Sequence, residues 1–159
     1  NLTTGTAVDA AIAAISAAVA RYQPGLKAER FLIEKQVTNA VAEMIIGVKR
    51  DPAFGLVLVV GAGGILVEMA QDAASLLLPT DRADVERAIR GLKVAKLLAG
   101  YRGKPAADID AVVDAILAVA GFAEAHRDRL GELDVNPLLV LPEGQGAVAV
   151  DALIVMAEG

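Results

Sequence analysis

The most apolar run in the chain, Leu56–Val67, has the sequence LVLVVGAGGILV and contains three glycines. It is too short to cross a bilayer as a helix, and glycine is unfavourable inside helices. Its first part, Leu56–Val60, is apolar at every position, which is typical of a strand that is buried on both faces or nearly so. We therefore predict an interior strand, followed by a glycine turn at 61–64.

The segments before and after this strand have the residue patterns of helices and strands. Apolar residues recur on one helical face in 6–22, where Thr6 is the expected N-cap, and further helices are expected at 80–92 (capped by Thr80), 93–99 and 106–126. Strands are expected at 31–37, 42–48, 65–69, 133–141 and 147–150, with a charged turn at 49–52 and another turn at 142–146. Because strands and helices do not alternate as in βαβ units, we predict an α+β fold with a mainly antiparallel sheet.

The composition excludes several classes of function. The 159 residues fit one domain, and 15 Lys and Arg against 20 Asp and Glu give a net charge of −5, which argues against a nucleic-acid partner. The absence of cysteine excludes disulfides and thiolate-bound metals, and the single histidine, His126, excludes a multi-histidine centre. No transmembrane helix or signal peptide is visible, so we expect no membrane partner and a cytoplasmic location. The sequence has no initiator Met, and we expect it to be a fragment.

Two oxygen-bearing side chains stand near the end of the sequence, in ELDVNPLLVLPEGQGAVAVD. A hairpin that turns near Gly144 would place Asn136 and Asp151 close to opposite each other on consecutive strands. Amide and carboxylate oxygens suit Mg²⁺, which usually takes only one or two protein carboxylates together with phosphates and water. The alternative is that Asn136 starts a bend and Asp151 ends a strand.

The glycine turn has two interpretations of its own. Backbone N–H groups of Gly61–Gly64 could cradle a phosphate, as in other glycine-rich turns. The segment is neither a Walker motif nor a dinucleotide-binding motif, because it lacks the Gly-Lys-Ser/Thr ending and has Leu66 at the last glycine position. A tight turn between strands explains it equally well.

Several motifs, in order, resemble the acyl-CoA synthetases that form a nucleoside diphosphate, a family that includes ADP-forming acetate–CoA ligase and the β-subunit of succinyl-CoA synthetase. The matching segments are AEMIIGVKRDPAFG, LVVGAGGILVEMAQD, LLAGYRG and the Asn-Pro segment above, so the resemblance runs from about Phe31 to Ile154. It implies that 29–159 form the second, C-terminal lobe of an ATP-grasp fold. Residues 1–28 would be the tail of the first lobe or a connecting helix.

The resemblance also implies a nucleotide and metal site. Asn136 and Asp151 would hold Mg²⁺, with Asp134 orienting them, and Arg50 would contact the phosphates as the catalytic cation. The residues expected to bind ATP or ADP are Glu34, Lys35, Gln36 and Val37 at the adenine, Glu43 at the ribose or phosphate, and Lys49, Gly63 and Gly64. On the residues alone, Lys49 and Arg50 could equally form a solvated turn.

The implied activity belongs to a larger protein. It would join a carboxylic acid to CoA through an acyl phosphate, while ATP is cleaved to ADP and phosphate. The family's first-lobe lysine, CoA-binding domain and acyl-binding domain have no counterpart in this sequence, so we expect this chain alone to be inactive. Two other readings remain: a nucleotide-sensing or degenerate lobe in a regulatory protein such as an acetyltransferase fusion, and an oligomerisation module. Apolar faces left by a missing lobe make a homodimer plausible.

Overall fold

A computed structural model describes residues 1–64 and 72–157, and the chain divides into two compact units, Asn1–Thr38 and Asn39–Gly159. The first unit contains α1 (Gly5–Tyr22), whose N-cap is Thr4 rather than the predicted Thr6; the Thr4 hydroxyl accepts a hydrogen bond from the Ala7 N–H at 3.2 Å. Within the described chain, α1 buries none of its side chains. No helix among the described residues is long and apolar enough to cross a membrane.

The prediction of a strand at 31–37 is wrong. The described segment 23–41 contains neither helix nor strand, and Leu32 and Ile33 are 83% and 65% exposed. A strand exists only where another strand pairs with its N–H and C=O groups, and the apolar pattern of FLIEKQV does not supply that partner.

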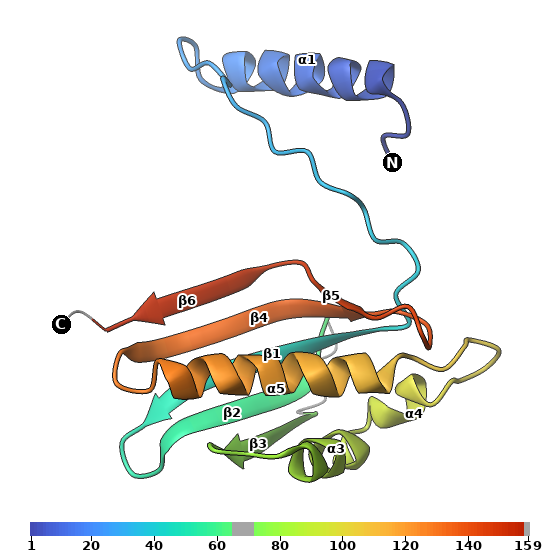
Figure 1. Ribbon diagram of the computed structural model, residues 1–159. Helices are drawn as coiled ribbons and strands as arrows, with labels where there is room; N and C mark the ends of the chain where they lie inside the picture. The colour runs from blue at the N-terminus through green and yellow to red at the C-terminus, as the bar shows by residue number, and fades with distance from the viewer. Residues whose placement is uncertain (65–71, 158–159) are drawn as a thin grey trace. The chain divides into compact units, whose positions relative to one another are not determined.

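The second unit is built on a six-stranded antiparallel sheet (Figure 1). Its strands are β1 (Ala42–Asp51), β2 (Gly55–Ala62), β3 (Ala73–Leu77), β4 (Leu130–Val140), β5 (Ala147–Ala149) and β6 (Ala152–Met156). They are ordered β3-β2-β1-β4, and both β5 and β6 pair with the other side of β4. The predicted α+β class with an antiparallel sheet is confirmed.

Among the described residues, three helices pack on one face of this sheet: α3 (Arg82–Gly91), α4 (Ala95–Leu98) and α5 (Ile109–Ala125) (Figure 1). Their apolar sides meet alternate residues of the strands in one core, which includes Met44, Ile46, Val48, Leu56, Leu58, Val60, Val85, Ile89, Leu98, Val112, Ile116, Leu133 and Val135. The N-cap of α3 is Asp81 rather than the predicted Thr80, since the Asp81 carboxylate accepts from the Asp84 N–H at 2.9 Å.

Strand boundaries differ from the prediction in informative ways. β1 continues through Asp51, so Lys49 and Arg50 belong to the strand and not to a charged turn. Gly61 and Ala62 likewise belong to β2. The short strands β3 and β6 were not predicted, and the strand predicted at 65–69 lies outside the described residues.

The core predicts a strong contrast between two leucines on strands. Leu58 on β2 is 0% exposed and Leu153 on β6 is 56% exposed. We expect Leu58→Ala to lower the free energy of unfolding by about 2–5 kcal/mol, because it leaves a cavity as well as losing apolar burial. Leu153→Ala should change it by less than about 1 kcal/mol. Urea unfolding of both variants checks this, and equal losses would contradict the assigned core.

Candidate functional site

The centre of the site is an irregularity where β4 pairs with β1. Met44 pairs with Leu138 and Ile46 pairs with Val135, so the Asn136–Pro137 pair stands opposite the single residue Ile45. This is a β-bulge, in which the additional residue bends its strand and redirects a side chain. The bulge, and not the regular alternation along β4, therefore sets the direction of the Asn136 side chain.

On its other side, β4 pairs without this shift, and Asp151 stands opposite Asn136. Leu138 pairs with Ala149 on β5, and Val135 pairs with Ala152 on β6. Between these pairs the Asn136 N–H donates a hydrogen bond to the Asp151 carbonyl at 3.1 Å. Both residues are exposed. The predicted juxtaposition is thus confirmed, while the role of the two side chains as metal ligands stays a prediction.

Polar residues extend from this pair over the sheet face that lies opposite the helices. Glu132 and Asp134 alternate with the buried Leu133 and Val135, which places them on that face. With Lys49 on β1 they line a shallow hollow of about 200 Å³. The sequence interpretation missed Glu132 and gave Asp134 only an orienting role. The alternation of polar residues in ELDVN was the signal for both.

Gly63 and Gly64 pack against the beginning of β1. The Gly63 N–H donates to the Glu43 carbonyl at 2.7 Å, and a Cβ on Gly63 would lie 2.9 Å from the Glu43 carbonyl carbon. Gly64 has a φ of +81°, which side-chain-bearing residues rarely adopt. Close packing therefore explains Gly63 and the backbone conformation explains Gly64, and the Gly63 N–H already donates to a main-chain carbonyl. The role of Gly63, Gly64 and Glu43 in nucleotide binding stays a prediction.

The buried carboxylate of Asp72 lies near this turn. Asp72 is 6% exposed, and it accepts hydrogen bonds from the N–H groups of Lys93 and Val94 at 2.6 and 2.8 Å. These bonds anchor the segment that leads into α4 against the end of β2, where Asp72 also accepts from the Ala62 N–H through its carbonyl. The acidic Glu68 lies outside the described residues.

Arg50 is not brought together with the other predicted site residues. It follows Met44, Ile46 and Val48 in the alternation of β1 and so lies on the helix side of the sheet. Its guanidinium Nη2 donates to the carbonyl of Arg127 and, at 3.0 Å, to that of Leu130. Arg127 belongs to the connection from α5 to β4, and Leu130 is the first residue of β4. Arg50 therefore fastens that corner, whereas Lys49 lies on the opposite, open face.

The four residues predicted to contact adenine belong to the first unit. Glu34, Lys35 and Gln36 are exposed and Val37 is half-buried, in a described segment without regular secondary structure. Their backbone N–H and C=O groups are not part of any strand ladder among the described residues. Adenine binding by these residues stays a prediction.

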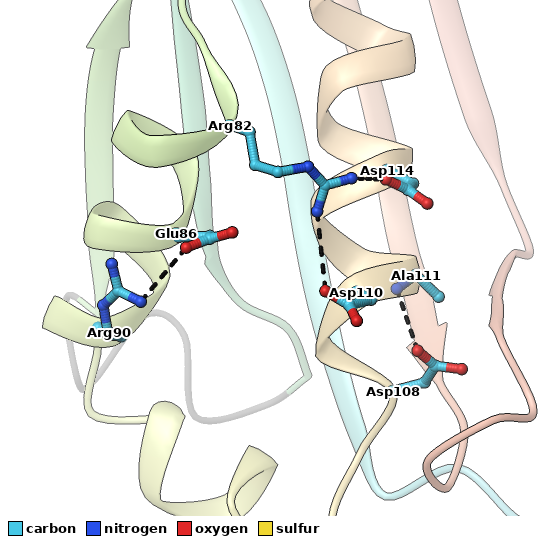
Figure 2. Close-up of polar contacts among 7 residues, drawn as sticks. All are labelled: Arg82, Glu86, Arg90, Asp108, Asp110, Ala111 and Asp114. Atoms are coloured by element: carbon cyan, nitrogen blue, oxygen red, sulfur yellow. Dashed lines mark hydrogen bonds and ion pairs between the residues drawn. The ribbon is translucent and has the colours of Figure 1, made fainter.

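The hairpin that joins β4 to β5 is attached to the start of α5. Asp108 is the N-cap of α5, and its Oδ1 accepts from the Ala111 N–H at 3.1 Å (Figure 2). Its Oδ2 accepts from the Gly146 N–H at 2.9 Å. Hydrogen bonds from Gly146 and Ala111 lower the pKa of Asp108 below its ordinary value, because they favour the charged carboxylate.

Ion pairs link α3 to α5, and also form within α3, on the same side of the sheet. Arg82 of α3 pairs with Asp110 at 3.7 Å and with Asp114, both on α5, and Arg90 pairs with Glu86 along α3 at 3.4 Å (Figure 2). These side chains are largely exposed, so each pair adds little stability on its own. They belong to the helical layer and not to the open face.

The second unit is an antiparallel sheet with helices on one face, and Asn136 and Asp151 stand opposite each other across its β4–β5 hairpin. This arrangement defines a lobe that could hold a metal and a nucleotide. The ATP-grasp domain family matches residues 1–156, and the chain belongs to this family.

Several of the proteins it is similar to are named ADP-forming ligases. The β-subunit of acetate–CoA ligase (ADP-forming) II from Pyrococcus furiosus is 41% identical over 114 residues, which cover 72% of this chain and 48% of that protein. Acetyl-coenzyme A synthetase 1 from Ca. Korarchaeum cryptofilum, solved with coenzyme A and acetyl-coenzyme A, is 34% identical with a TM-score of 0.83, over 98% of this chain and 68% of that one. Another structure of that synthetase, with coenzyme A and Mg-AMPPCP, gives 37% identity and a TM-score of 0.66, over 72% and 53% of the two chains. The chain therefore spans about half the length of the curated ligase subunit.

The contacts of Arg50 predict a structural effect for its removal. We expect Arg50→Met to lower the free energy of unfolding by about 1 kcal/mol, because two carbonyls lose a charged donor in a partly solvated place. Lys49→Met on the open face is the matched control and should leave stability nearly unchanged. Urea unfolding measures both. Unchanged stability together with weakened nucleotide binding in Arg50→Met would instead support the phosphate contact expected from the sequence.

The lowered pKa of Asp108 predicts a pH-dependent contribution to stability. A carboxyl whose pKa is lower in the folded than in the unfolded chain stabilises the fold above its unfolded value, and this contribution is lost as pH falls through the folded value. The difference in unfolding free energy between the wild-type chain and Asp108→Asn should therefore be constant above about pH 5 and shrink below the ordinary value of 3.8. Urea unfolding at a series of pH values tests this, and a difference that grows on acidification would contradict it.

Proposed function

We propose that this chain supplies the metal-holding part of the nucleotide site in an ADP-forming acyl-CoA synthetase. The observation that carries the proposal is the opposed placement of Asn136 on β4 and Asp151 between β5 and β6, joined by the hydrogen bond from the Asn136 N–H to the Asp151 carbonyl. The relatives named above are ligases of this type, and one of the similar structures contains Mg-AMPPCP. Because this chain keeps both oxygen-bearing side chains in register, a working site is favoured over a degenerate one.

The donor set fits magnesium that arrives together with a nucleotide. One carboxylate and one amide oxygen are hard ligands, and Mg²⁺ commonly completes its octahedron with phosphate oxygens and water. Among the described residues, no group of three or more His, Cys, Asp or Glu side chains gathers as a ready-made metal cage. Bound Mg²⁺ would neutralise charge on the phosphoryl group that is transferred.

The remaining polar residues would act on the nucleotide itself. Lys49 lies on the open face beside the hollow and would attract phosphate oxygens. Glu43, next to the glycine turn, would contact the ribose or a phosphate, and Gly64 would approach a phosphate closely. The backbone of Glu34–Val37 would hydrogen-bond the adenine edge. Arg50, which fastens the corner between α5 and β4, would support the site from the other side of the sheet.

In the whole protein the proposed reaction joins a carboxylic acid to CoA through an acyl phosphate, with ATP cleaved to ADP and phosphate. CoA and the acid would bind to parts of the protein beyond this lobe. Those parts would also supply the rest of the nucleotide pocket. The acyl group would be chosen there as well, so the chain alone should bind nucleotide without catalysing CoA ligation.

Calorimetric titration of ADP into the chain, with and without Mg²⁺, tests the proposal. We expect Mg²⁺ to strengthen ADP binding in the wild-type chain. In Asp151→Asn, the Mg²⁺-dependent gain in ADP affinity should be at least about tenfold smaller. The reason is that even changes outside the direct ligands weaken metal sites by about 10–100-fold.

Asp128→Asn is the matched control, since it removes the same charge from an exposed aspartate before β4. It should retain the full Mg²⁺ effect. The proposal for this chain is wrong if ADP binding does not depend on Mg²⁺, or if Asp151→Asn responds to Mg²⁺ as the wild type does.

A further inference from the structure

We infer that Asp108 is a positioning residue for the Asn136–Asp151 pair, because its carboxylate ties the returning arm of the β4–β5 hairpin to the N-terminus of α5. The consequence for metal binding rests on the function proposed above. The placement of the hairpin rests only on contacts within this unit.

The outgoing arm of the hairpin is held by the main chain. The Asp108 N–H donates to the Leu141 carbonyl at 2.9 Å, and the Glu143 N–H donates to the Ala106 carbonyl at 2.9 Å. Ala107 and Pro142 form a β-bridge between the same two segments. These bonds fix the end of β4 against the loop that enters α5, and they do not depend on the side chain at 108.

The returning arm is held at Gly146 by two hydrogen bonds. The Leu141 N–H donates to the Gly146 carbonyl at 3.1 Å within the hairpin, and the side chain of Asp108 ties the same residue to α5. The Asp108 Oδ2 accepts from the Gly146 N–H at 2.9 Å, directly before β5 begins at Ala147. From there the register with β4 runs from Val140–Ala147 to Leu138–Ala149 and on to the bond between the Asn136 N–H and the Asp151 carbonyl. In a hairpin, the turn fixes the register of the strands that follow it. The anchored Gly146 therefore determines where Asp151 meets Asn136.

The two oxygens of Asp108 have separate partners, and this makes a sharp test possible. Oδ1 caps α5 through the Ala111 N–H, and Oδ2 holds Gly146. Asparagine is as good an N-cap as aspartate, but it has one carbonyl oxygen and an NH₂ group that cannot accept. In Asp108→Asn the amide oxygen can keep the helix cap, while an NH₂ donor then faces the Gly146 N–H.

Amide hydrogen exchange in the chain without nucleotide measures the positioning directly. The reporters are the N–H groups of Asn136 and Val150, which donate to Asp151 and Pro137 across the hairpin. We expect Asp108→Asn to speed their exchange roughly tenfold, the usual effect of losing one charged hydrogen bond. The amides of β2 serve as internal references and should keep their rates. Asp81→Asn is the matched control, because the Asp81 carboxylate caps α3 through the Asp84 N–H, a contact within α3 that does not involve the hairpin.

The same variants are then titrated with ADP and Mg²⁺. Asp108→Asn should reduce the Mg²⁺-dependent gain in ADP affinity about tenfold, and Asp81→Asn should leave it unchanged. Faster exchange confined to Asn136 and Val150 supports the inference even if the wild-type chain shows no Mg²⁺-dependent binding, which would overturn only the proposed function. Unchanged exchange at both amides, or an equal increase in β2, would overturn the inference.

Discussion

The central pairing of β1 with β4 contains one residue more in β4 than in β1, and the geometry of the site depends on this difference. The additional residue is accommodated where Asn136 and Pro137 stand opposite Ile45. Without it, side chains on one side of this point would change faces, because the alternation along a strand has a period of two. On the side of β5 and β6 the register is constant from Glu132 to Val140, so Asn136 is redirected relative to β1 but stays opposite Asp151.

The same period of two separates the residues of the basic pair. Adjacent residues in a strand point to opposite faces, so Lys49 and Arg50 cannot act on one ligand while both belong to β1. Lys49 borders the hollow on the open face, and Arg50 reaches the Arg127 and Leu130 carbonyls at the helix side. The sequence interpretation placed both in a turn, where this restriction would not apply. Extending the strand by only a few residues changed the expected function of Arg50.

The sequence predicted best those elements whose signal is local and repetitive. Leu56–Val60, with its apolar side chains, and the helical spacing around Val112 and Ile116 both correspond to observed elements. Strands that depend on a distant partner were not predictable in this way. The apolar segment 31–37 forms no strand, whereas the five-residue β6 forms one along β4 despite its exposed side chains. The Asn136–Asp151 pair was predictable because a hairpin links its strands, but the bulge and the Gly146 contact of Asp108 arise only from tertiary packing.

A site with two protein ligands also constrains how metal and nucleotide bind together. Two oxygens leave most of the Mg²⁺ coordination sphere to water and phosphate, so the ion gains more from the site when a nucleotide is present. By thermodynamic linkage, the nucleotide then gains the same factor from the ion. With Asn136 and Asp151 as the proposed ligands, the protein would influence that factor through their spacing, which the hairpin register sets. In the proposed site, the contact between Asp108 and Gly146, away from the ligands, would tune the coupling between metal and nucleotide without contacting either.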